Sequence, residues 1–382
     1  MRTHALIDLE RLAANYQQIR AAAGSKVTVL PVVKADAYGH GAIEVVRTLS
    51  GAGAGWFAVS CLEEGVALRT AGIEGEIVVL CGFYPGEEAD ARAHRLTPMV
   101  QTFEQLDRWN QQAGASGNRL PFHLELDTGM TRLGLDAEPL DRVVDSIRQA
   151  SHLRLDGLAS HFASAHDFGG GQASEQSAQF LSLAKRLSER GIRPRYIHMS
   201  NSAAIAYRAR DDRGMVRPGL ALYGYLPEAS GPAPEARFRV EPVLEWKARM
   251  ISVREVAKGV RLGYDASYTA PEPLRVGVVS VGYGDGYSRR MSNGGQMLVR
   301  GHGCPVVGLV SMDVTLVDLR PAPQAEPGDE VTLIGKGLDA IRMAAHCGTI
   351  PYEVLCSLSK RVPRTYRKHP AKQARISHHV AR

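Results

Sequence analysis

The chain has 382 residues, of which 44% are hydrophobic and 23% charged, a composition that is typical of a soluble globular protein and a length that suits two domains. Its net charge of +6 comes from residues 364–382, which hold six lysines and arginines and no acidic residue. The rest of the chain is balanced, with 40 basic and 40 acidic residues, so the charge does not indicate a nucleic-acid-binding protein. No apolar run approaches the ~18 residues of a membrane span, and the charged start MRTHALIDLE argues against a secretory signal. The five cysteines include no C-x-x-C pair. This pattern predicts a cytoplasmic protein without a disulfide scaffold or a metal site.

The first 225 residues alternate between short apolar runs and segments with helical periodicity. In residues 137–150 the apolar residues from Leu140 to Ile147 recur at the i, i+3, i+4, i+7 spacing of one helix face, and Gly191 is a predicted helix stop. Strands that alternate with helices pair in parallel through right-handed crossovers. The eight predicted strands are 27–33, 56–60, 76–80, 97–101, 121–126, 153–160, 195–200 and 215–223.

Eight such units over roughly 220 residues predict a (β/α)8 barrel of the TIM type, which we assign to residues 1–230. An open doubly wound sheet is the alternative, but no G-x-G-x-x-G follows the first strand. A barrel enzyme places its chemistry at the carboxyl ends of its strands.

The composition and the hydrophobic pattern of the sequence change after Tyr225. Residues 226–237 are rich in Pro, Ala and Glu and form a predicted connector. Short β-branched runs, punctuated by Gly, Pro and Asp, then predict a separate, mostly-β domain over residues 231–366. The basic tail, residues 367–382, is a predicted disordered extension.

Several polar residues follow the predicted barrel strands. Taken singly, each has an ordinary structural explanation, because a lysine after a strand commonly keeps its charge in water and Ser–Asn pairs commonly cap helices. Their joint occurrence at one end of a single barrel favours a functional site. These residues are Lys34, Arg132, His161, Asn201, Ser202 and Arg217.

Eight motifs along the chain carry a specific resemblance. They are VVKADAYGHG, DTGMTRLG, HMSNSAA, RPGLALYGY, GYDASYTA, SVGYGDGY, VSMD and IPYEVLCSLSKRVPR. Together they resemble the alanine racemase family of pyridoxal-phosphate enzymes, in order and in register over about residues 3–366. The resemblance implies an isomerase that interconverts L-alanine and D-alanine and supplies D-alanine for peptidoglycan.

The resemblance also implies how pyridoxal 5′-phosphate is held. Lys34 would form a Schiff base with it, which requires an amine whose charged form is destabilised by burial and nearby cations. Arg217, which stays protonated, would face the ring nitrogen and make the ring a weaker electron sink, and His161 and His198 would orient it. The other implied cofactor-binding groups are Tyr38, Asn201, Ser202, Tyr352 and the backbone amides of Gly219 and Leu220.

Racemisation removes a proton from one face of the substrate carbon and returns one to the other, which two bases on opposite faces achieve most simply. The resemblance assigns Lys34 to one face and Tyr264, lent by the second subunit of a homodimer, to the other. Arg132 and the backbone amide of Met312 would bind the substrate carboxylate. The residues implied around the entrance are Tyr283, Tyr352 and Asp313.

One position departs from the family pattern. Many members carry a carbamylated lysine two residues before the DTGM motif, where this chain has Glu125. A glutamate supplies a negative charge without modification. We therefore predict that Glu125 hydrogen-bonds Arg132 and replaces the carbamate.

The sequence allows three other functions, which differ from alanine racemisation in features that can be named. A racemase of broader specificity, or one for serine or a basic amino acid, would differ mainly in the volume of the pocket. An amino-acid decarboxylase on the same barrel would be expected to carry a catalytic cysteine in its β-domain instead of Tyr264 and Met312. A non-catalytic pyridoxal-phosphate carrier would resemble the barrel alone.

Overall fold

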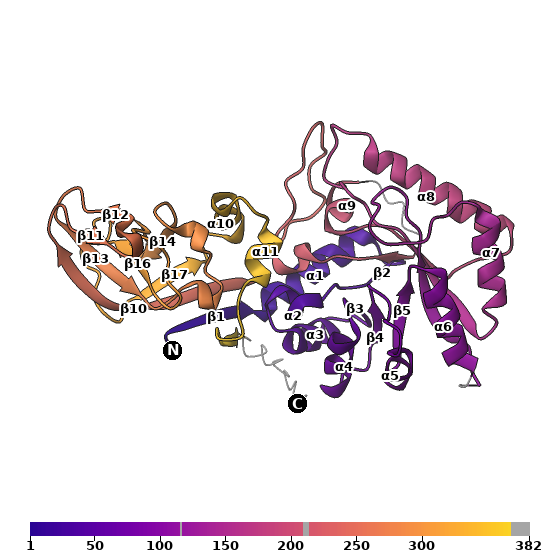
Figure 1. The fold of residues 1–382 in the computed structure, drawn as a ribbon. Coiled ribbons are helices and arrows are strands. Elements are labelled where there is room, and N and C mark those ends of the chain that lie inside the picture. The colour runs from indigo at the N-terminus through magenta and orange to yellow at the C-terminus, as the bar shows by residue number, and fades with distance from the viewer. Residues whose placement is uncertain (115–116, 209–213, 368–382) are drawn as a thin grey trace, which may run out of the picture.

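The structure is a computed structural model that describes residues 1–114, 117–208 and 214–367. Within these residues the chain forms a parallel barrel and a mostly-β domain beside it, as Figure 1 shows. The fold expected from the sequence is therefore confirmed. The predicted disorder of the basic tail concerns residues that, beyond Arg367, lie outside the described ones.

Eight parallel strands of the described chain close into the barrel. Six of them pair in sequence order, from β3 to β8, and β2 pairs with β9. The bridges Val32–Ala58 and Ile197–Gly214 join these two sets into a ring. The strands are β2 (Thr28–Val29), β3 (Trp56–Val59), β4 (Glu76–Val79), β5 (Leu96–Val100), β6 (Leu120–Glu125), β7 (Leu153–Ala159), β8 (Tyr196–His198) and β9 (Met215–Val216).

Helices connect these strands, as the alternating pattern predicted. The apolar face expected in residues 137–150 forms α7, where Leu140, Val143 and Val144 are buried. Gly191 follows α8 with φ +82°, a conformation that suits glycine at a helix end. The helices are α1 (Leu9–Ala23), α2 (Lys34–Tyr38), α3 (Ala42–Gly51), α4 (Leu62–Thr70), α5 (Glu88–Ala93), α6 (Phe103–Gly114), α7 (Leu140–Gln149), α8 (Gln172–Glu189), α9 (Ser202–Tyr207) and the short 3₁₀ helix η1 (Leu220–Tyr223).

The second domain is built on a sheet in the order β15-β14-β17-β10-β1-β18, with β13 paired to β10 and β16. Two helices, α10 (Ala340–Cys347) and α11 (Pro351–Cys356), lie between this sheet and the barrel (Figure 1), and α11 packs against α2. The strands are β1 (Thr3–Asp8), β10 (Leu244–Val256), β11 (Arg261–Leu262), β12 (Tyr268–Thr269), β13 (Leu274–Val279), β14 (Gln296–Val299), β15 (His302–Pro305), β16 (Thr315–Asp318), β17 (Glu330–Ile334) and β18 (Arg364–Arg367), and the 3₁₀ helices are η2 (Tyr264–Ala266), η3 (Tyr283–Asp285) and η4 (Arg289–Met291).

The two ends of the described chain meet in this sheet. Strand β1 pairs antiparallel with β10 and parallel with β18, so the first residues of the predicted barrel segment contribute a strand to the β-domain. Arg367, which the sequence assigned to the tail, is the last residue of β18 and donates to the carboxylate of Asp8 over 2.7 Å. The hydrophobic core is continuous from the barrel into the β-domain, where Trp246 and Tyr287 are fully buried.

Candidate active site

Lys34 follows the buried end of the first barrel strand and opens an unusual turn. The next four residues, Ala35 to Tyr38, all have positive φ, between 52° and 55°. This conformation costs roughly 1–2 kcal/mol for each residue with a side chain, so other contacts must stabilise it. The amide of Ala35 donates to the Glu64 carboxylate over 2.6 Å, and the amide of Ala37 donates to the carbonyl of Val33 over 2.8 Å. Lys34 therefore stands on a turn that is bonded both to α4 and to the end of its own strand.

Tyr38 ends this turn inside a group of aromatic rings. Its ring centroid lies 4.8 Å from that of Tyr223 and 5.8 Å from that of Tyr352 on α11. Burial raises the pKa of the Tyr38 hydroxyl, and burial also raises that of Tyr352. Both groups are therefore neutral hydrogen-bond donors at physiological pH.

The Tyr38 hydroxyl faces a cradle of backbone at the start of η1. A Cβ atom on Gly219 would lie 2.6 Å from Tyr38 Oη, so only glycine fits there. The Ser202 hydroxyl accepts the amides of Gly219 over 3.0 Å and of Ala221 over 3.1 Å. The bonds of Ser202 to the amides of Gly219 and Ala221 were not expected from the sequence, and the expected role of the Leu220 amide toward a phosphate stays a prediction. Asn201 caps α9 by accepting the amide of Ala204, the ordinary role of such a residue.

Arg217 is a buried cation held by neutral acceptors. Its guanidinium donates to the carbonyls of Ser160 (2.7 Å) and His198 (2.9 Å), to His198 Nδ1 (2.6 Å) and to His161 Nδ1 (3.3 Å). Burial, followed by the charges of Arg217, Arg132 and Lys34, lowers the pKa of His161 to about 3. Burial and Arg217 also hold the pKa of His198 well below its usual value. The two imidazoles are therefore neutral, and the positive charge stays on Arg217.

A third histidine, His123 on β6, extends the series of hydrogen bonds that begins at Arg217. His198 accepts from Arg217 through Nδ1, so its proton lies on Nε2, which is 2.9 Å from His123 Nδ1. His123 is fully buried, and burial lowers its pKa to about 4. His123 was not among the site residues expected from the sequence. The signal was its position two residues before Glu125, because residues two apart on a strand share one face.

Glu125 has a different partner from the one expected. It is buried, and its carboxylate accepts the side-chain amide of Gln101 over 2.8 Å. In the part of the chain that the structure describes, Arg132 is exposed and forms no hydrogen bond with Glu125. The reason is local. One carboxylate oxygen of Asp127 accepts the amides of residues 129–131. The resulting turn places Arg132 at the surface beyond the end of β6.

The β-domain residues of the expected site lie at the surface of this single chain. The exposed fractions are 66% for Tyr264, 51% for Met312 and 44% for Tyr283. Within residues 1–114, 117–208 and 214–367, no hydrogen bond or ring contact joins them to the barrel residues above. Asp313 accepts a hydrogen bond from Arg361 over 2.5 Å. The structure thus gathers the buried barrel residues together with Tyr352 of α11 and leaves Tyr264, Met312 and Tyr283 apart from them.

No helix of the described ranges is long and apolar enough to cross a bilayer. In the same ranges, no group of three or more His, Cys, Asp or Glu side chains is placed to hold a metal ion.

Comparisons with known proteins agree on one family. The family descriptions "Alanine racemase, N-terminal domain" and "Alanine racemase, C-terminal domain" match residues 7–227 and 243–366. The alanine racemase of Geobacter sulfurreducens is 37% identical over 372 residues, which are 95% of this chain and 97% of the relative. The catabolic alanine racemase of Pseudomonas putida is 38% identical over 369 residues, which are 95% of this chain and 98% of the relative.

Solved structures give the same result. The alanine racemase from Bartonella henselae with covalently bound pyridoxal phosphate has a TM-score of 0.86 and 29% identity, and the match covers 96% of this chain and all of that one. The alanine racemase from Bacillus anthracis with bound L-Ala-P has a TM-score of 0.87 and 31% identity, over 96% and 95% of the two chains. The expected class of enzyme, an amino-acid racemase, is confirmed, and the chain belongs to the alanine racemase family.

Proposed function

We propose that this chain interconverts L-alanine and D-alanine with pyridoxal 5′-phosphate, and that it supplies D-alanine for peptidoglycan synthesis in the cytoplasm. The observation that carries the proposal is the buried Arg217, held by carbonyls and neutral imidazoles at the same end of the barrel as Lys34. A cation in that position opposes protonation of a ring nitrogen, whereas a carboxylate would favour it.

The residues present fit pyridoxal phosphate. Lys34 offers an amine on a fixed turn, and the missing Cβ atom of Gly219 lets the backbone approach the Tyr38 hydroxyl closely. The hydroxyls of Tyr38, Tyr352 and Ser202 would be donors for a phosphate, and the amides of Gly219 and Ala221 hold the Ser202 hydroxyl in place. Late barrel strands commonly bind such groups. When bound, the cofactor supplies an electron sink for the pair left on the substrate carbon as a proton departs.

Two side chains of the protein would then handle the proton. Lys34 takes it on one face of the substrate carbon, and Tyr264 gives or takes it on the other. Tyr264 is exposed on η2 and has no contact with the barrel cluster in the described chain. We therefore propose that Tyr264 serves the barrel of a second copy in a homodimer, together with the Met312 amide and Tyr283.

The remaining groups bind the substrate. Arg132 is exposed, and its charge acts on His161 at the carboxyl end of β7, so we propose that it binds the substrate carboxylate. Glu125 is bonded to Gln101, so the carbamate-like pairing with Arg132 that the sequence suggested is not part of this proposal. This arrangement suits a small amino acid with one carboxylate.

The direct test combines isotope exchange with a panel of amino acids resolved by chiral chromatography. In deuterium oxide we expect L-alanine to gain deuterium at the α-carbon as optical rotation is lost, without release of carbon dioxide or pyruvate. Carbon dioxide release would indicate a decarboxylase, and faster turnover of serine or lysine would indicate a racemase of different specificity. No exchange with any amino acid would overturn the proposal.

A further inference from the structure

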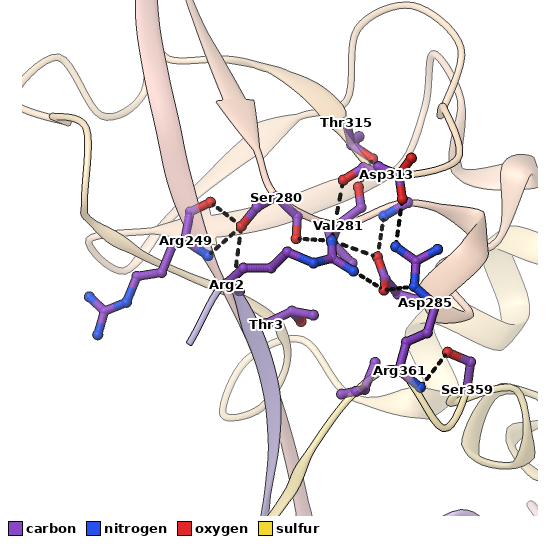
Figure 2. A network of polar contacts seen from close by, with 12 residues as sticks. Arg2, Thr3, Arg249, Ser280, Val281, Asp285, Asp313, Thr315, Ser359 and Arg361 are labelled. Carbon is purple, nitrogen blue, oxygen red and sulfur yellow. Dashed lines mark hydrogen bonds and ion pairs between the residues drawn. The ribbon is translucent and has the colours of Figure 1, made fainter.

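The loops that carry Tyr283 and Met312 are joined by a charged cluster, which Figure 2 shows from close by. At its centre is Asp285, the last residue of η3, whose side chain is fully buried. Its carboxylate accepts the amide of Gly282 over 3.1 Å and pairs with the guanidinium groups of Arg2 and Arg361. A buried carboxylate needs such partners, because an unpaired charge away from water is costly.

Arg2 connects three separate segments through its side chain. Nη1 donates to Asp285 over 3.1 Å, to the carbonyl of Ser280 over 3.0 Å and to the carbonyl of Asp313 over 3.5 Å. The Arg2 carbonyl in turn accepts the Ser280 hydroxyl over 2.7 Å. The start of the chain is therefore bonded to both loops, before β1 enters the sheet.

Arg361 completes the cluster from the other side. It donates to the Asp313 carboxylate over 2.5 Å and lies against Gly284, where a Cβ atom would come within 2.4 Å of its guanidinium. The two loops are also bonded directly, through the amide of Tyr283 to the carbonyl of Ser311 (3.0 Å) and the amide of Gly284 to that of Met312 (3.0 Å). The carbonyls of Ser311 and Met312, on either side of the Met312 amide, are thus bonded to the loop that carries Asp285.

We propose that Arg2, Asp285 and Arg361 form a positioning cluster, which holds the Met312 amide and the Tyr283 ring at the angle needed to close the substrate site of the partner subunit. This inference rests on the proposed function, which assigns Met312 and Tyr283 to that site. It adds three residues that touch neither substrate nor cofactor and that act through the two loops. Loss of the cluster should weaken substrate binding more than turnover, because the groups it positions bind the substrate and do not move its proton.

The test uses Arg2→Met in the loaded enzyme, with Arg2→Lys as the conservative variant. The matched control is Arg300→Met, which removes the Arg300–Asp329 ion pair (2.7 and 3.1 Å) from the same sheet. We expect Arg2→Met to raise KM for L-alanine about 10-fold with kcat changed less than about twofold, and Arg2→Lys to restore part of the affinity. Sedimentation should show a folded dimer, and thermal unfolding should show a lower melting temperature than that of Arg300→Met, because the buried Asp285 loses one of its two cations.

Two kinetic results would refute the positioning role of the cluster. A KM for Arg2→Met equal to that of Arg300→Met, whatever the melting temperature, would make the cluster a structural brace only and overturn the inference. A fall in kcat alone would overturn it as well. Asp285→Asn is the stronger variant, but Arg2→Met keeps the test valid if Asp285→Asn fails to fold. If the wild-type enzyme does not racemise alanine, the proposed function fails and the inference falls with it, whereas an active wild type with an unaffected variant refutes the inference alone.

Discussion

The barrel end and the β-domain loops, which we propose to meet over one substrate, differ sharply in their surroundings. In the barrel, Arg217 and Ser202 are buried and already hydrogen-bonded, and Gly219 lets the backbone approach Tyr38 closely. In the β-domain, Tyr264 and Met312 are exposed on short loops. One half of the site is therefore formed within a single chain, and the other half becomes useful only when a second chain approaches. This contrast predicts different effects for substitutions in the two regions.

The largest effect is expected at the barrel lysine. Lys34→Ala removes the amine that bonds the cofactor and one of the two bases, so racemase activity should fall by about 10⁴-fold or more. Lys185→Ala, at an exposed lysine on α8, should have no effect. Activity and the visible absorbance of the bound cofactor are the measurements. Retention of both by Lys34→Ala would place the cofactor on another residue.

Tyr264→Phe should have the next largest effect, and an asymmetric one. It removes the phenol while keeping the ring, so deuterium exchange should fall by about 10²- to 10⁴-fold from one alanine enantiomer and less from the other. Tyr84→Phe is the control, since Tyr84 is 70% exposed on the barrel. Equal losses from both enantiomers would refute the assignment of Tyr264 to one face.

A smaller effect is expected in the cradle. Gly219→Ala places a methyl group 2.6 Å from Tyr38 Oη, so one of the two must move, and affinity for pyridoxal phosphate should fall by about 10-fold. Gly51→Ala is the matched control, because a Cβ atom there meets nothing within 4 Å. Equilibrium dialysis of the two variants measures the difference. Equal affinities would mean that the cradle does not hold the phosphate.

The buried histidines make stability depend on pH. Burial lowers the pKa of His40 and of His123 to about 4, below the value of about 6.5 in the unfolded chain. Between these values the unfolded state binds protons that the folded state does not, so the unfolding free energy falls as pH falls from 6.5 towards 4, by about 1.4 kcal/mol per pH unit for each histidine.

Urea unfolding at several pH values measures this slope. His40→Asn should flatten it, whereas substitution of the exposed His302 in the β-domain should leave it unchanged. If the substitutions of His40 and His302 changed the dependence of unfolding free energy on pH equally, the buried histidine of the barrel would not be its source.

The regular part of the molecule was predictable from the sequence. The presence of eight barrel strands and the change to a β-domain follow from apolar periodicity, and the confirmed family follows from the eight motifs. The last predicted strand, 215–223, was too long, because residues 220–223 form η1. Local periodicity could not show that β1 pairs with β10 and β18, because that pairing joins residues far apart in the chain. It also could not show that β18 includes Arg367.

The details of the site were less predictable for the same reason. The positive φ values of Ala35 and Ala37 have no signature in residues that normally avoid them. The Gln101 partner of Glu125 comes from the end of a neighbouring strand, and the contact between His198 and His123 joins two strands of the barrel. Such contacts are set by how strands pair in register, which the spacing of residues along one strand does not reveal.

The central claim, that a complete site contains residues of two subunits, is tested most directly by mixing inactive variants. Lys34→Ala and Tyr264→Ala subunits should each be inactive alone. After dissociation and reassembly in equal amounts, half of the dimers should be mixed, each with one intact site, which restores about a quarter of the wild-type activity. A mixture that stays inactive although mixed dimers form would show that both residues act within one chain, and it would contradict the account.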